Sequence, residues 1–163
     1  MSHTGFDGCA VLREHSAFDR LPLPLMKWLS SRARLQLARQ DEVIFSRDDP
    51  GRSFYLVAQG AVKICVISAE GREAVFTIAH RGDSFGEIAV LDGSTRTANA
   101  IAKADCKLMV IDRNDLLHVM AANPHSHWRS YSWCVRGTVG LARSWRRRCC
   151  WIFPNGWPRR YSG

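Results

Sequence analysis

The chain has 163 residues, of which 46% are hydrophobic and 23% charged. This length suffices for one domain with a core and a short appendage. No apolar run approaches the roughly 18 residues that a membrane-spanning helix needs, and the N-terminus lacks the order of charge and apolar residues found in a secretory signal. We therefore expect a cytoplasmic protein with no membrane partner.

The formal net charge of +8 is distributed unevenly along the chain. The first 124 residues hold 15 acidic and 15 basic side chains, so their formal charge is zero. Residues 125–163 hold eight arginines and no acid. The overall charge therefore does not predict a basic surface on the folded part of the chain.

The first predicted element is a short amphipathic helix within residues 16–33. It is expected to begin near Pro24, because proline is tolerated in the first turn of a helix. Residues 1–15 are assigned to an N-terminal arm, and His15 at its end is expected to be at the surface or half-buried.

Short segments rich in β-branched and aromatic residues come next and predict strands. They are residues 43–45, 54–57, 61–67, 74–78 and 108–111. Gly60, Gly71, Gly82 and Gly93 recur every 11 residues in turn-like settings, where positive φ angles are expected. This rhythm predicts a mainly β fold, an all-β sandwich or jelly roll, with short flanking helices. A last helix is predicted to follow Asp112 and to end at Asn123.

The segment from Gly82 to Ala98 combines residue types that suit a phosphorylated sugar. Glu87 opens a short apolar turn, and Arg96 follows nine residues later after a Gly-Ser-Thr turn. Backbone N–H groups at the start of a helical turn attract an anion, and an arginine offers a planar charged fork for phosphate. A carboxylate can accept hydrogen bonds from a sugar. The alternative is that Glu87 and Arg96 form an ion pair that only fastens the loop.

The run Gly86-Glu87-Ile88-Ala89, followed by Arg96-Thr97-Ala98, resembles the phosphate-binding cassette of the cyclic-nucleotide-binding domain. That family includes Crp/Fnr transcription regulators, kinase regulatory subunits and nucleotide-gated channels. The resemblance covers about residues 16–124 and implies a double-stranded β-helix, or jelly-roll, domain over that range.

The resemblance also implies a role for each matching residue. Glu87 would bind the ribose 2′-hydroxyl with help from the Gly86 backbone, and Arg96 would pair with the cyclic phosphate. Further contacts would come from the backbone amides of Ile88 and Ala89, from Thr97, and, for base or ribose, from Phe76 and Thr77. The implied ligand is cAMP or cGMP. No metal and no catalytic residue is expected, so the chain is interpreted as a non-enzymatic sensor.

Residues 125–163 depart from the Crp/Fnr pattern, in which a long helix forms the dimer interface and leads to a helix-turn-helix domain. Five of the six tryptophans lie in this basic tail, and its glycines and prolines oppose a long helix. We interpret the tail as an out-of-frame translation. The chain would then be truncated, DNA would be a partner only of an intact parent protein, and the dimer expected of that parent would be doubtful here.

Two other classes of function stay open at this point. The tail could be a basic aromatic arm that binds nucleic acid, with the roll serving as a scaffold. His125 and His127 could belong to a cupin-like metal enzyme. A cupin needs its histidines on strands near a carboxylate, whereas this pair follows Pro124. The primary interpretation is therefore the sensor domain of a Crp/Fnr-like transcription regulator.

Overall fold

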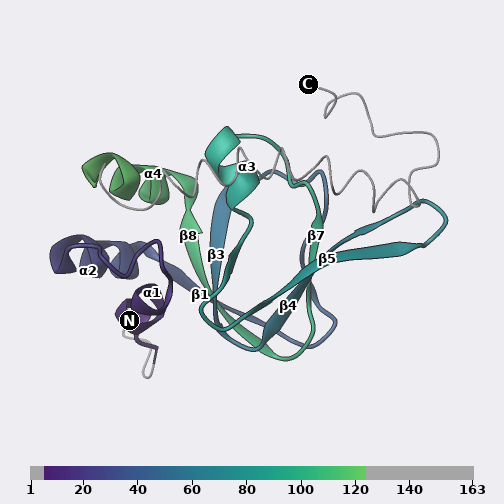
Figure 1. The fold of residues 1–163 in the computed structure, drawn as a ribbon, viewed down its shortest axis with the longest axis horizontal. Coiled ribbons are helices and arrows are strands. Elements are labelled where there is room, and N and C mark those ends of the chain that lie inside the picture. Colours follow the sequence, from purple (N-terminus) through teal and green to yellow (C-terminus); the bar gives the residue numbers. More distant parts are fainter. Residues whose placement is uncertain (1–5, 124–163) are drawn as a thin grey trace.

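A computed structural model describes residues 6–123 of the chain. Two four-stranded antiparallel sheets form a roll, flanked on one side by helices (Figure 1). One sheet has the strand order β1-β8-β3-β6 and the other β2-β7-β4-β5. The jelly-roll fold predicted from the turn spacing is confirmed.

The elements follow one another in a simple order along the chain. The helices are α1 (Gly8–Glu14), α2 (Leu23–Arg32), α3 (Glu87–Asp92) and α4 (Arg113–Ala122). The strands are β1 (Arg34–Ala38), β2 (Val43–Phe45), β3 (Ser53–Gln59), β4 (Ala61–Ile67), β5 (Glu73–His80), β6 (Ser84–Phe85), β7 (Asn99–Ala102) and β8 (Cys106–Asp112).

Strand β3 separates two hydrophobic clusters, and its sequence shows why. Phe54 and Leu56 point to one face, where they pack with residues of α1, α2 and α4. Tyr55 and Val57 point to the opposite face, into the interior of the roll. Because successive side chains of a strand alternate in direction, a strand buried on both faces is a continuous apolar run.

The N-terminal residues take part in the core. Helix α1 lies within the segment predicted as an arm, and Leu12 on it is fully buried against the helices and β3. His15 was expected at or near the surface, but its exposed fraction is only 5%. Both ring nitrogens have partners: Nδ1 accepts from the amide of Ala17 at 3.2 Å, and Nε2 lies 2.9 Å from Oγ of Ser84.

The turn glycines adopt the backbone that their spacing predicts. The φ angles of Gly60, Gly71, Gly82 and Gly93 all lie between 74° and 90°. Asp112 precedes α4 as expected, but its side chain caps no amide of that helix. Its Oδ1 instead accepts long hydrogen bonds from Arg34 at 3.4 Å and from Oγ of Ser53 at 3.5 Å.

Candidate functional site

A single cavity of about 110 Å³ brings the predicted site residues together. It lies between the cassette around α3 and the inner face of the second sheet. All eight predicted residues line it: Phe76, Thr77, Gly86, Glu87, Ile88, Ala89, Arg96 and Thr97. Side chains from segments 20 residues apart, such as Phe76 and Arg96, therefore face one space, as a binding site requires.

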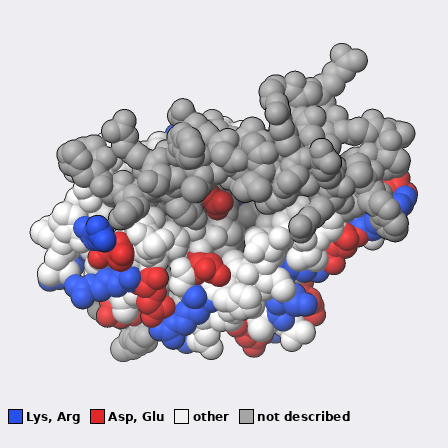
Figure 2. All heavy atoms as spheres, viewed as in Figure 1, with Lys and Arg blue, Asp and Glu red and all other residues white. Residues whose placement is uncertain are grey.

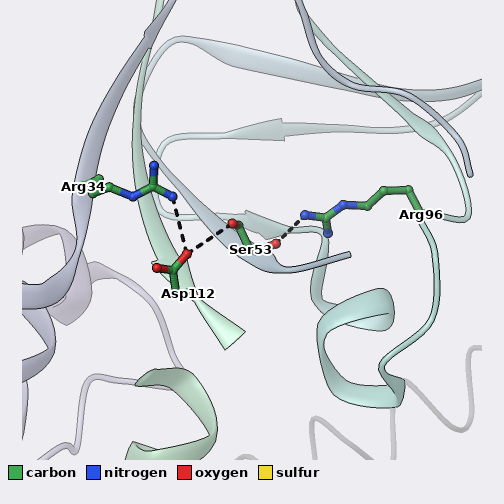
Figure 3. A network of polar contacts seen from close by, with 4 residues as sticks. All are labelled: Arg34, Ser53, Arg96 and Asp112. Atoms are coloured by element: carbon green, nitrogen blue, oxygen red, sulfur yellow. Dashed lines mark hydrogen bonds and ion pairs between the residues drawn. The ribbon is translucent and has the colours of Figure 1, made fainter. Parts of the chain in front are cut away.

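The guanidinium of Arg96 is held inside the protein, with only 3% of the residue exposed. Its Nη1 donates to the carbonyl of Gly86 at 2.7 Å, and its Nη2 donates to the carbonyl of Ser53 at 2.6 Å. Figure 3 shows the second of these bonds and the link from Ser53 onward to Asp112 and Arg34. The buried Nε has no hydrogen-bond partner among the described residues.

Glu87 and Arg96 share the cavity but form no ion pair within the described residues, so the loop-fastening alternative finds no support there. Burial raises the pKa of Glu87, and a backbone hydrogen bond and, after it, the positive charge of Arg96 offset this only in part. Burial likewise lowers the pKa of Arg96, against the opposing effects of Tyr55 and Glu87. Each group thus pays a desolvation cost that its partner does not cancel.

Gly86 is placed where no other residue fits without distortion. Its φ is +81°, in the left-handed region, and it caps the N-terminus of α3. A Cβ added there would lie 2.6 Å from Nη1 of Arg96. The glycine therefore allows the backbone turn and the close approach of the guanidinium at the same time.

The backbone around Arg96 is fixed to the turn that follows β2. The amide of Arg96 donates to the carbonyl of Asp49 at 2.8 Å, and the carbonyl of Arg96 accepts from the amide of Asp48 at 2.9 Å. Asp48 has a φ of +70°. An isolated bridge between Pro50 and Thr95 extends this pairing by one step. The arginine thus enters the cavity from a defined point of the roll.

Helix α3 is also fastened at its C-terminal end. Nε of Arg113, the first residue of α4, donates to the carbonyl of Val90 at 2.7 Å. The last carbonyls of a helix have no partner within the helix, and a cation is favourable there. This short helix is therefore held by α4 at one end and followed by Gly93 in the left-handed conformation.

Sequence reasoning missed other residues that line the cavity: Phe45, Ile64, Ser84, Phe85 and Ala98. It also missed the carbonyl of Ser53, which accepts from Arg96. Ala98 belongs to the matched run Arg96-Thr97-Ala98, but no role was assigned to it. The others belong to strands whose approach to the cassette depends on how the two sheets pack.

The described part of the chain offers little to the alternative functions. Within residues 6–123 no group of three or more His, Cys, Asp or Glu side chains is arranged to hold a metal ion. None of the helices in this range has the length and apolar character needed to cross a membrane. His125 and His127, together with the whole basic tail, lie outside the described residues.

The roll and its cassette define a β-roll domain of the jelly-roll class, and comparison with known families specifies it further. The family model described as "Cyclic nucleotide-binding domain" matches residues 35–123, more than half of the chain. The chain belongs to the cyclic nucleotide-binding domain family.

Individual relatives agree with this assignment. The chain is 34% identical over 89 residues to the "Cyclic AMP receptor protein" of Thermus thermophilus, a match that covers 55% of this chain and 41% of that protein. This chain thus spans about two fifths of the length of that relative.

Two solved structures are similar in fold. The N-terminal domain of a transcriptional regulator from Streptomyces coelicolor A3(2) has a TM-score of 0.67 and 25% identity, over 81% of this chain and 94% of that chain. The cAMP-bound structure of PfPKA-R has a TM-score of 0.63 and 26% identity, over 68% of this chain and 39% of that one.

Proposed function

We propose that this domain binds a cyclic nucleotide, cAMP or cGMP, as the sensor part of a Crp/Fnr-like transcription regulator and catalyses no reaction. The observation that carries the proposal is the cavity that Glu87 and Arg96 share without pairing. A buried guanidinium without a carboxylate partner is well suited to an anionic ligand. The relatives that bind cAMP support this choice of ligand.

The division of roles follows from charge and position. Arg96 would pair with the cyclic phosphate, with Thr97 and the amides of Ile88 and Ala89 adding hydrogen bonds. Glu87 would accept from the ribose 2′-hydroxyl, beside the Gly86 backbone. Phe76 and Thr77 on β5 also line the cavity, where they would contact the base or ribose.

Calorimetric titration with cAMP and with cGMP tests this proposal. Wild type should release or absorb heat in a saturable way with at least one of them, and Arg96→Ala should not. Arg39→Ala is the matched control, because this exposed arginine lies outside the cavity. Equal binding by wild type and Arg96→Ala would refute the assignment of Arg96.

For residues 125–163 we propose an out-of-frame origin, so that DNA and a dimeric partner would belong to an intact parent protein. Their composition, with eight arginines, five tryptophans and no acid, supports this. The nucleotide sequence of the gene tests it: one of the other two frames beyond codon 124 should encode an amphipathic helix and a helix-turn-helix. If neither does, a basic nucleic-acid-binding arm becomes the better explanation, and salt-dependent retention on DNA would reveal it.

A further inference from the structure

The hydrogen bonds of Arg96 do not by themselves account for the placement of its buried guanidinium. Two carbonyls, from Gly86 and Ser53, accept from its Nη atoms. These bonds hold the edge of the guanidinium but not its two flat faces. No carboxylate of the described residues forms an ion pair with it. A buried charge without such a partner is costly, so another group must stabilise it.

An aromatic ring provides that stabilisation. The Cζ atom of Arg96 lies 4.1 Å from the centroid of the Phe45 ring and 5.6 Å from that of Tyr55. A guanidinium within about 6 Å of a ring centroid is attracted by the electron-rich face, most strongly where water is excluded. The shorter of the two distances makes Phe45 the main contact.

Phe45 is itself held in place by its surroundings. It ends β2, where the register with β7 shifts at a bulge or similar irregularity, and such irregularities redirect side chains. Its ring packs against Tyr55 and Phe85, with centroids 5.6 and 5.9 Å away. Tyr55 and Phe85 are stacked on each other at an interplanar angle of 9°. The ring beneath the guanidinium therefore belongs to a packed aromatic cluster.

We propose that Phe45 is a positioning residue for Arg96: its ring holds the guanidinium at the orientation in which it meets the anionic ligand. This inference rests on the proposed nucleotide site and extends it to a residue on another strand. The two carbonyls fix the rotation of the guanidinium within its plane, and the ring fixes the plane. Such preorganisation lowers the ordering cost of binding.

A double-mutant cycle tests the proposal, because Phe45 also lines the cavity and could contact the ligand directly. Affinities for cAMP and cGMP are measured by NMR titration, which reaches the millimolar range, for wild type, Phe45→Leu, Arg96→Gln and the double variant. We expect Phe45→Leu to weaken binding about tenfold when Arg96 is present. In the Arg96→Gln background, the same change should weaken binding less than about twofold. Equal factors in both backgrounds, or no loss in wild type, would overturn the proposal.

Three further variants sharpen the cycle. Phe45→Tyr keeps the ring face and should bind like wild type. Phe45→Met fills a similar volume without a ring and should weaken binding as Phe45→Leu does. It replaces Phe45→Leu in the cycle if Phe45→Leu folds poorly. Ile64→Ala changes another apolar wall of the cavity and should weaken binding by the same factor with or without Arg96. Coupling to Arg96 that is seen for Phe45 but not for Ile64 separates positioning from ordinary contact.

A measurement without ligand distinguishes this inference from the nucleotide site itself. The ring current of Phe45 should shift the side-chain N–H resonances of Arg96 in wild type, and Phe45→Leu should return them toward ordinary values. If wild type binds neither nucleotide but shows this shift, the proposed function fails while the positioning contact stands. If wild type binds and the resonances do not move, the positioning role is wrong and the proposed function survives.

Discussion

Burial shifts two ionisable side chains of opposite sign toward their neutral forms in the same cavity. The pKa of Glu87 is raised and that of Arg96 is lowered, in both cases chiefly by loss of solvent. Neither group gains an ion pair in return within the described residues. Polar groups kept at such a cost are typical of binding sites, where stability is given up for function.

Replacing Glu87 tests this cost. When folding raises the pKa of a carboxyl group, the group contributes stability at a pH below its ordinary pKa of 4.5. That contribution is lost as the pH rises through the pKa of the folded state. Glu87→Gln should therefore unfold at a higher denaturant concentration than wild type at pH 7, and the gain should vanish below pH 4.5. Its nucleotide affinity should fall.

Glu14 should affect stability in the opposite direction, because hydrogen bonds from Arg81 lower its pKa. Glu14→Gln should leave stability at pH 7 unchanged or lower, because this pair is exposed to solvent. A gain in stability for Glu14→Gln, or a loss for Glu87→Gln, would contradict the assigned environments.

Comparing alanine substitutions at Gly86 and Gly71 separates the cost of backbone strain from the cost of a clash with Arg96. Gly86→Ala combines an unfavourable φ with a clash against Arg96, whereas Gly71→Ala has a similar φ of +77° and no atom within 4 Å of the added Cβ. Gly71→Ala should lower the free energy of unfolding by about 1–2 kcal/mol. Gly86→Ala should lower it further and weaken nucleotide binding at least about tenfold. Equal effects in urea titrations of both variants would show that the guanidinium moves aside freely.

At the scale of elements, His15 joins the N-terminal helices to β6. Its Nδ1 accepts from the amide of Ala17, so the ring proton lies on Nε2 and is directed to Ser84, a residue of the cavity wall. Burial lowers the pKa of His15, and the charges of Asp83 and Asp19 oppose this only in part. Folding therefore favours the neutral ring.

Acidification should weaken this connection. When folding lowers the pKa of a histidine, the ring contributes stability at a pH above its ordinary pKa of 6.5. That contribution is lost as the pH falls through the pKa of the folded state. The free energy of unfolding of wild type should drop between pH 7.5 and pH 5.5, by more than that of His15→Gln, in which the amide can still donate to Ser84. Parallel pH profiles for the two proteins in urea titrations would contradict this role.

The sequence predicted those elements whose residues have a strong local preference. Strands β2 and β4 were predicted at their observed bounds, and β3, β5 and β8 over most of their length. Strand β7 was missed because its buried residues, Ala100 and Ala102, are alanines, which have little preference for strands. Helix α1 was missed because its stability comes from packing, with Leu12 in the core.

The same distinction applies to the site. Residues 86–97 of the cassette are contiguous in sequence, so the sequence could predict that they act together. Phe45 and the carbonyl of Ser53 reach Arg96 only through the packing of β2 and β3. No local pattern marks a strand end as the partner of a distant arginine, and for that reason the support beneath the guanidinium was not foreseen.

At the scale of the whole molecule, the roll and the tail differ in formal charge, since all of the excess positive charge lies in residues 125–163. Residues 6–123 carry no formal net charge. On the face shown in Figure 2, acidic and basic side chains are interspersed over the described surface. The described residues on this face therefore offer no single-sign field to attract DNA.

The most direct test of the nucleotide site is a calorimetric titration of the full chain with cAMP and cGMP, repeated with Arg96→Ala and the control Arg39→Ala. We predict saturable binding of at least one nucleotide by wild type and by Arg39→Ala, and no detectable binding by Arg96→Ala. Retained binding by Arg96→Ala, or no binding of either nucleotide by folded wild type, would contradict the site built around this buried guanidinium.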